Sequence, residues 1–313
     1  MARVYTGNDL IISIRNLPMI PNNSAAGSTD ADLLRHADEA MIEDLVPLLH
    51  QTQEEYLVAR EREPLVSGTK RYRLPTRAMW NKLRHIRIVD STGAVTSSLN
   101  IVSRDQEDYT VDGNDCYLEG NWLHLLGDSL TGLLEYTFYF RPGQIQKTDA
   151  VAKIIATDGA SPTTKFTVSS TVPSTFLPSI NYDIHSGESG AEVKAWDIQP
   201  VGTPDTDEAS FTKTDIDGST AGRLPVVVGD YICLAEETGV VPLPKEWHPL
   251  VARAAALRYV EATEDFDAVK FHAGHLNAAR ERQIKSAERR VESKPMRIGG
   301  KRGPLYAGRS GAF

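Results

Sequence analysis

The chain has 313 residues, of which 41% are hydrophobic and 24% charged, a composition typical of a soluble globular protein. Its two cysteines, Cys116 and Cys233, lie far apart in the sequence, which excludes a disulfide framework and a cysteine-based zinc site. No apolar run approaches the ~20 residues that span a bilayer, and no signal peptide is recognisable. We therefore expect a protein made in the cytoplasm and without a membrane anchor.

The net charge of −8 is distributed unevenly. Residues 280–313 contain ten Lys or Arg and three Asp or Glu, a net charge of +7, so the preceding 279 residues carry −15. Residues 142–245 alone hold fourteen acids and seven bases. An acidic body with a basic tail favours docking of the tail on an acidic partner, and a solvated tail without a partner is the alternative.

The first predicted elements are helices. Residues 1–28 contain several turn-forming residues, which predicts an extended segment. Thr29, followed three residues later by Asp32, predicts the N-terminus of an amphipathic helix. Pro47 is expected to break or kink this helix and to begin a second helical segment that runs to about Arg60.

Two β-rich regions follow. Residues 69–143 contain short strand-like runs separated by glycine turns, which predicts a small β-unit. Residues 144–243 form a second β-rich region, interpreted as an inserted domain, in which the Thr-, Asp-, Ser- and Gly-rich stretch 202–222 is expected to be a loop or a weak hairpin. The predicted strands are Arg71–Leu74, Leu83–Val89, Val95–Val102, Cys116–Leu118, Trp122–Leu126, Leu133–Phe140, Val151–Ala156, Lys165–Val172, Glu192–Ile198 and Val226–Leu234.

Helical periodicity returns after residue 243. Pro249 suits the first turn of one helix, and a second helix is predicted from about Asp265 to Val291. At about 1.5 Å per residue, the second helix is on the order of 40 Å long, so its final turns should project beyond a small core. Pro295 ends it, and the glycine-rich residues after it are expected to form an extended arm.

These elements predict an α+β fold. A helical frame, built from N-terminal helices and two C-terminal helices, carries β-rich units, one of them interpreted as an insertion, and an extended C-terminal arm. The predicted boundaries are 1–68, 69–143, 144–243, 244–293 and 294–313.

The sequence lacks the common catalytic motifs, including the phosphate loop, the dinucleotide fingerprint, the nucleophile elbow and the zinc-protease helix. The glycine-rich run Gly218–Arg223 has neither the spacing nor the lysine of a phosphate loop and is interpreted as a turn. His272 and His275 lie three residues apart on a predicted helix, but no third metal ligand is evident. We predict a protein that is not an enzyme and that carries no metal and no cofactor.

Two segments resemble a known family. Their order of helix, strand and helix resembles the head-to-tail adaptor (connector) proteins of tailed bacteriophages, which lie beneath the portal ring. The resemblance covers the helical frame and the first β-unit, about 60% of the chain, and leaves out 144–228. It is carried by Asp44–Leu49, Gln53–Leu57, Tyr72–Ala78 and Lys82–Arg84 in the first segment, and by Gly229–Ile232, Pro244–Leu250, Arg258–Tyr259 and the helix to Glu292 in the second.

The resemblance implies a structural role in the virion neck between capsid and tail. Such adaptors form a ring, typically of twelve copies, around the DNA channel. Their partners are the portal above, a tail or nozzle protein below, and double-stranded DNA that passes through the lumen without specific binding. The C-terminal arm is expected to dock on the portal through Lys294, Pro295, Arg297, Lys301, Arg302, Tyr306, Arg309 and Phe313.

A binding module is the alternative function. In that hypothesis the second β-rich region recognises a glycan or a host surface, and Phe176, Tyr182 and Trp196 form a stacking platform. The competing interpretation places these three aromatic side chains in the core. Binding of nucleic acid is not favoured, because aromatic residues are not interleaved with the basic ones.

Overall fold

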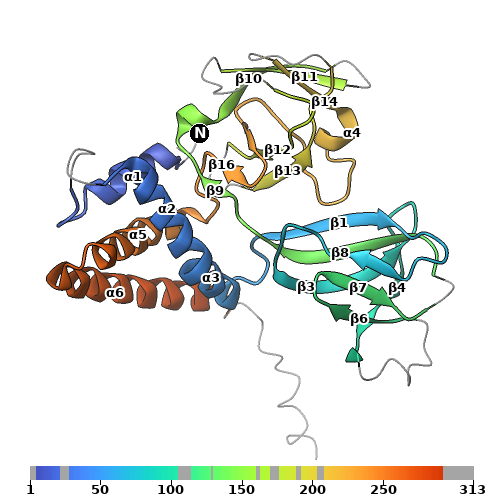
Figure 1. Ribbon diagram of the computed structural model, residues 1–313, viewed down its shortest axis with the longest axis horizontal. Coiled ribbons are helices and arrows are strands. Elements are labelled where there is room, and N and C mark those ends of the chain that lie inside the picture. The colour runs from blue at the N-terminus through green and yellow to red at the C-terminus, as the bar shows by residue number, and fades with distance from the viewer. Residues whose placement is uncertain are drawn as a thin grey trace, which may run out of the picture.

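The computed structural model describes residues 5–21, 28–104, 114–127, 130–159, 163–169, 176–187, 192–202 and 208–291, with side chains to residue 286 in the last helix. These residues fold into a helical module and two β-units, each with an apolar core of its own (Figure 1). The predicted α+β class is confirmed. The predicted arm, 294–313, lies outside the described residues.

Both ends of the described chain contribute to the helical module. Its centre is α5, whose alanine-rich surface allows α1, α2 and α6 to pack closely around it. None of the helices in the described part of the chain is long and apolar enough to cross a membrane. The elements are α1 (Gly7–Arg15), α2 (Asp30–Ala40), the π-helical turn η2 (Met41–Leu45), α3 (Val46–Thr52), the 3₁₀ turn η5 (Lys245–Trp247), α5 (His248–Ala262) and α6 (Phe266–Val291).

The N-terminal segment is helical where the sequence was expected to be extended. Thr6 caps α1, because its hydroxyl accepts the N–H of Asp9 while the Asp9 carboxylate accepts the N–H of Thr6. Leu10 and Ile14, one turn apart, are fully buried against the other helices. The expectation failed because this helix has only nine residues and its apolar stripe is correspondingly short.

The same capping arrangement at Thr29 and Asp32 confirms the predicted start of α2. Pro47 does not end the helical path, because the π-helical turn before it rearranges the hydrogen bonds and Pro47 then lies in the first turn of α3. The predicted extension to Arg60 is wrong: α3 ends at Thr52, and the chain enters a strand at Val58.

The first β-unit consists of two sheets packed around one core. The order of strands is β1-β8-β3-β4 in one sheet and β2-β7-β6-β5 in the other. Phe138 and Leu123 are fully buried between the sheets. The strands are β1 (Val58–Pro64), β2 (Arg71–Arg73), β3 (Ala78–Val89), β4 (Val95–Ser98), β5 (Asn100–Ile101), β6 (Asp115–Glu119), β7 (Trp122–Leu125) and β8 (Leu133–Phe140).

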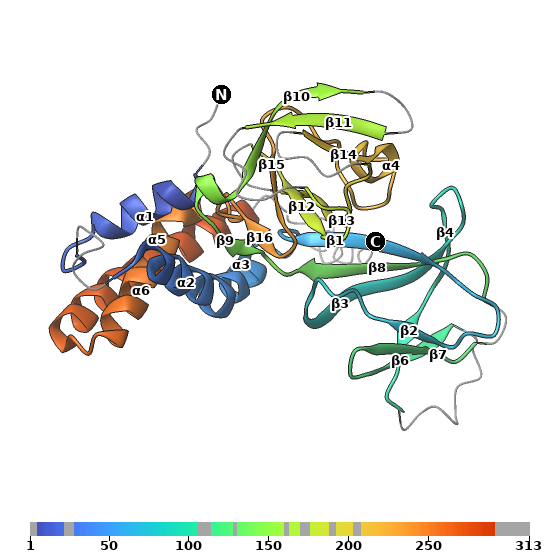
Figure 2. The same cartoon turned by 45° about the horizontal axis from the view of Figure 1, so that its top comes forward.

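The second β-unit is a curved sheet that lies over the junction of the other two modules (Figure 2). Among the described residues its strand order is β13-β12-β15-β10-β11-β14. The sequence did not predict β12, and the expected loop 202–222 contains β14 and α4. The elements are β10 (Ala152–Asp158), β11 (Thr163–Val168), β12 (Tyr182–His185), β13 (Val193–Ile198), β14 (Glu208–Thr212), α4 (Lys213–Ile216) and β15 (Tyr231–Leu234).

Two short parallel strands connect the second β-unit to the rest of the chain. The chain enters the unit through β9 (Gln144–Ile145) and the 3₁₀ turn η4 (Thr148–Ala150), and it leaves through β16 (Glu237–Thr238). The pairing aligns Gln144 with Glu237 and Ile145 with Thr238. The entry and the exit of the second β-unit are therefore adjacent.

Candidate partner-binding surfaces

The residues predicted to dock on a portal, Lys294, Pro295, Arg297, Lys301, Arg302, Tyr306, Arg309 and Phe313, all lie outside the described residues. The described chain leads to them through α6. The candidate surfaces described below are α6 and its contacts, the cavities of the molecule and the junction between its modules.

The middle of α6 is fixed to the rest of the helical module by charged side chains. Arg258 of α5 donates to Glu43 at 2.7 Å and to Asp44 at 3.2 Å. Arg280 of α6 lies 3.6 Å from the same Asp44 carboxylate. The two arginines and the two acids thus tie α5 and α6 to the π-helical turn.

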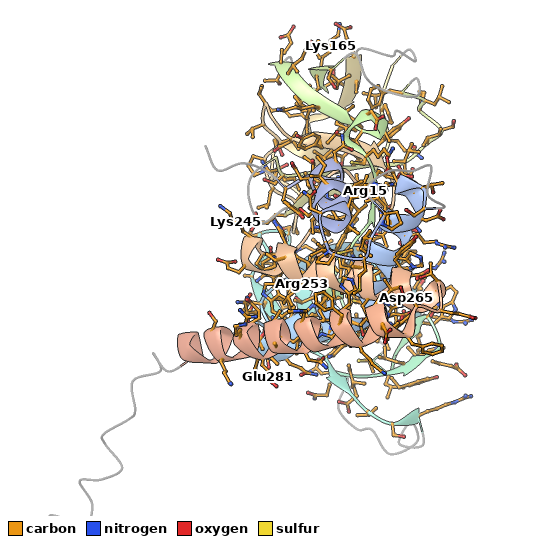
Figure 3. The ribbon with its side chains drawn as sticks, turned by 90° about the vertical axis from the view of Figure 1, so that its left-hand side faces the viewer. Arg15, Lys165, Lys245, Arg253, Asp265 and Glu281 are labelled. Carbon is orange, nitrogen blue, oxygen red and sulfur yellow. The ribbon has the colours of Figure 1, made fainter. Side chains whose placement is uncertain are left out.

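Beyond Arg280 the helix is mostly exposed. Glu281, Arg282 and Lys285 are exposed, whereas Ile284 remains half-buried. Figure 3 shows α6 continuing past Glu281 and beyond the end of α5. The predicted projection of this helix from the helical module is therefore seen in the structure.

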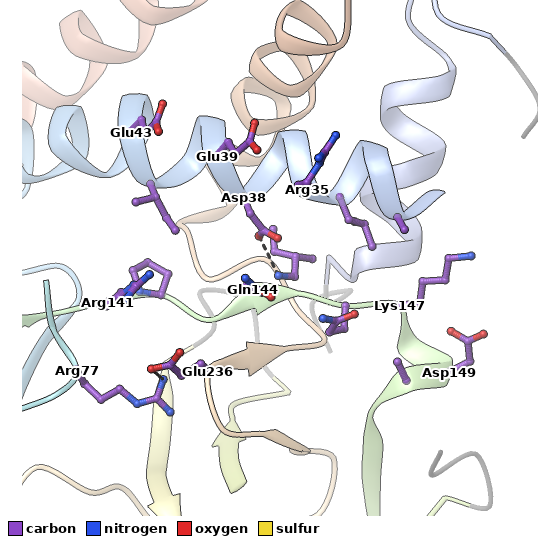
Figure 4. A pocket seen from close by; sticks show the side chains of 17 residues that line it. Arg35, Asp38, Glu39, Glu43, Arg77, Arg141, Gln144, Lys147, Asp149 and Glu236 are labelled. Carbon is purple, nitrogen blue, oxygen red and sulfur yellow. Dashed lines mark hydrogen bonds and ion pairs between the residues drawn. The ribbon is translucent and has the colours of Figure 1, made fainter. Parts of the chain in front are cut away.

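A groove of about 920 Å³ separates α2 from β9. The wall formed by α2 and η2 carries Asp38, Glu39 and Glu43, and the opposite wall carries Arg141 and Lys147 (Figure 4). Lys147 bridges the two walls by pairing with Asp30 of α2 at 2.6 Å. A groove with charged walls suits a polar or charged partner segment better than an apolar ligand. This makes the groove a second candidate surface for contact with another chain.

Asp38 lies on the inner side of this groove. One of its carboxylate oxygens accepts the backbone N–H of Ile145 at 2.9 Å, which connects α2 to β9. Burial raises the pKa of Asp38 to about 7, and the hydrogen bond from Ile145 opposes that rise. Asp38 is thus a structural contact between modules whose charge changes near neutral pH.

Arg77 joins the two β-units. Its guanidinium, 2% exposed, pairs with the buried Asp183 and donates from Nε to Asp197 at 3.1 Å. Asp183 also accepts the backbone N–H groups of Asp197 and Glu236, each at 3.0 Å. Because every charge in this cluster has a partner, burial of the arginine is tolerated.

Sequence reasoning missed Arg77 and Asp38. A signal was present for Asp38, because it lies one helical turn after the apolar Leu34 and next to Ala37, both of which are buried. A polar residue beside the buried face of a helix commonly contacts another polar group. For Arg77 the partners lie more than 100 residues away along the chain, and no local pattern identifies them.

The aromatic platform proposed for glycan binding is contradicted by the structure. Phe176 and Tyr182 are each 3% exposed and pack against each other with ring centroids 5.2 Å apart. Trp196 is 5% exposed and meets Phe140 edge to face at 5.4 Å. The three side chains are nearly fully buried and belong to two different cores, so they do not form a stacking platform for a sugar.

The predicted turn at Gly218–Arg223 is confirmed. Gly218 and Gly222 have φ values of 79° and 81°, which suit glycine. Arg223 is held within the turn by Asp215.

His272 is buried, and its Nε2 lies 3.0 Å from the carbonyl oxygen of Pro18, which gives it a structural contact. Among the described residues, no three His, Cys, Asp or Glu side chains are grouped as a metal site. Cys116 and Cys233 are free and buried.

No protein-family model matches the sequence, and a search of curated proteins found no match.

Proposed function

We propose that this protein is a structural head-to-tail adaptor of a tailed bacteriophage. Copies of the chain form a ring, of twelve by the family resemblance, under the portal in the virion neck. The ring joins the capsid to a tail or nozzle protein and continues the DNA channel. The C-terminal arm binds the portal.

The projecting α6 is the observation that supports this proposal most. The helix is held near its middle by Arg280, which lies beside the Asp44 carboxylate that Arg258 of α5 also contacts, and it is mostly exposed beyond that point. The C-terminal segment, 294–313, contains five Lys or Arg and no acid. A rigid stem followed by a basic segment suits attachment to an acidic groove on a partner.

Ring symmetry strengthens such attachment. Docking costs each arm conformational entropy, but arms on one ring bind together, so each docking raises the effective concentration of the next. A body with a net charge of −15 over residues 1–279 suits a channel past which DNA slides, because like charges repel.

Deletion of 294–313 tests the proposal. We expect the truncated protein to keep its far-ultraviolet circular dichroism and its midpoint of thermal unfolding, because the deleted residues follow the described fold. We expect it to lose co-sedimentation with rings of the cognate portal.

A matched control replaces Arg297, Lys301 and Arg302 with glutamine in the full-length chain. Partial loss of portal binding, most evident at low salt where charges are least screened, is expected if charge contributes to docking. Undiminished binding by the truncated protein rejects the assigned role of the arm. No described feature favours the glycan-binding alternative, since its three aromatic residues are buried.

A further inference from the structure

Trp80 is held in solvent by an unusual backbone. It is 61% exposed, although it lies within β3, an inner strand of its sheet that is flanked by β8 and β4. Trp80 and Asn81 have φ values of 52° and 55°, in the left-handed region that bulky side chains rarely adopt. Strain of this kind persists only where surrounding contacts impose it, and it often marks a functional position.

The residues on either side of Trp80 make the contacts that impose this strained backbone. Pairing passes from Ala78 opposite Phe140 to Leu83 opposite Phe138, so β3 bulges out of the ladder between these pairs. Met79 is buried in the core of the helical module, and the Asn81 amide donates to the Asn121 side chain at 2.6 Å. Both neighbours are anchored, and the indole between them points outward.

A mostly apolar pocket, large enough for an aromatic ring, lies between the two β-units. It has a volume of about 220 Å³, and roughly 150 Å³ suffices for a benzene ring. It is lined mostly by apolar side chains, with Glu55 and Glu192 among the lining residues. The apolar lining is formed by Tyr56, Leu57, Phe140, Val193, Trp196 and Leu224.

The charges beside the indole and beside the pocket are complementary. Lys82, two residues after Trp80, is exposed, and its ammonium lies 4.9 Å from the centre of the Tyr139 ring. Glu192 at the pocket is exposed as well. An aromatic side chain beside a cation thus matches an apolar pocket beside a carboxylate.

We propose that Trp80 of one copy inserts into the pocket between the β-units of a second copy, with Lys82 of the first copy beside Glu192 of the second. This inference deepens the proposed function, because a ring requires a contact between copies. The two patches differ, so the contact is heterologous, and repetition of a heterologous contact closes into a ring when the rotation between copies permits it. Large aromatic side chains in apolar pockets commonly dominate the affinity of such interfaces.

A disulfide across the predicted contact tests it while leaving Trp80 in place. Two variants, Lys82→Cys and Glu192→Cys, are purified separately, mixed in the full-length chain and oxidised. We expect a cross-linked pair on non-reducing gels from the mixture. Because Cys116 and Cys233 are buried, they do not compete. Mixing Val66→Cys, at an exposed position of the first β-unit, with Glu192→Cys is the control and should give no specific product.

Sedimentation velocity on the full-length protein provides the second measurement. Trp80→Ala should weaken self-association at least tenfold. Val95→Ala, at another exposed apolar position of the same unit, should leave self-association unchanged. Lys82→Glu should weaken it, and the reversed pair Lys82→Glu with Glu192→Lys should restore it. Circular dichroism confirms that each variant is folded.

The outcomes separate this contact from the proposed function. If the protein forms rings, the cysteine pair gives no cross-link and Trp80→Ala leaves ring formation unchanged, the contact is overturned. The adaptor proposal then still stands. Formation of the disulfide supports the contact, and wild-type protein that sediments as a dimer and no larger, alone and with portal, counts against the ring. A chain that self-associates neither alone nor with portal overturns both.

Discussion

Arg77, in the turn just before β3, and Asp183 of β12 form a buried ion pair that joins the two β-units, with side-chain exposures of 2% and 1%. The pair connects residues that lie 106 positions apart in the sequence. It therefore fixes how the second β-unit sits on the first.

Replacing Arg77 with alanine should destabilise the protein strongly. Asp183 would remain buried without its main counter-charge, a change that typically costs about 3–5 kcal/mol. Urea denaturation monitored by tryptophan fluorescence measures the loss. Arg84→Ala is the control, because Arg84 pairs with the exposed Glu55 and such a pair contributes about 1 kcal/mol or less. Equal effects of the two substitutions would show that the buried pair does not stabilise the junction.

Asp38→Asn should change how stability depends on pH. Burial raises the pKa of Asp38 from 3.8 to about 7, so the folded state binds a proton that the unfolded chain releases. The associated stability is fully present below about pH 4 and is lost as pH rises through 7. Asparagine retains an oxygen for the Ile145 N–H and cannot ionise. We expect the variant to exceed the wild type in unfolding free energy at pH 8 by on the order of 2 kcal/mol.

The measurement is a pair of urea titrations at pH 5 and pH 8. The wild type should lose more stability than Asp38→Asn between these two values. Asp149→Asn, at an exposed position on the same groove, is the control and should keep the wild-type dependence. Identical pH dependence in all three proteins contradicts the assigned titration.

Gly222→Ala should disturb the contact between the second β-unit and β1. A Cβ at Gly222 would lie 2.1 Å from the carbonyl oxygen of Arg60, and the glycine also has a φ of 81°. Gly68 has the same φ, but a Cβ added there would meet nothing within 4 Å. We expect Gly68→Ala to cost about 1 kcal/mol from backbone strain alone. Gly222→Ala should cost about 3 kcal/mol, since overpacking adds to the strain. Thermal unfolding of both variants distinguishes the two contributions.

The thiols of Cys116 and Cys233 should be inert in the folded protein. Burial raises the pKa of both, that of Cys116 to about 12, so neither forms a reactive thiolate at pH 8. Ellman's reagent should detect no thiol within minutes under native conditions and two per chain in urea. Rapid reaction of one thiol in the native state would mean that its surroundings open readily.

Local signals predicted the parts of the fold that local interactions determine. Thr29 and Asp32 were identified as a helix start because their hydrogen bonds lie within one turn. A short strand-like run after the turn at Gly132 likewise identified β8, seven of whose eight residues are buried.

Elements that depend on distant partners escaped prediction. The charged residues of β1 resemble a helix surface, yet Arg62 pairs with Glu135 and Glu63 accepts a hydrogen bond from Tyr136, both on β8. The strand β12 contains Asp183, which is buried because Arg77 neutralises it. The candidate surfaces behave similarly, since the groove and the pocket exist only once separate modules meet.

The adjacency of β9 and β16 makes the second β-unit a removable cassette. Its two ends already lie side by side, so gain, loss or exchange of the cassette leaves the path of the surrounding chain unchanged. Arg77 is the exception, because the acids around it, Asp183, Asp197 and Glu236, all belong to the cassette. Relatives that lack the cassette should therefore also lack an arginine at this position, and the two features should be inherited together.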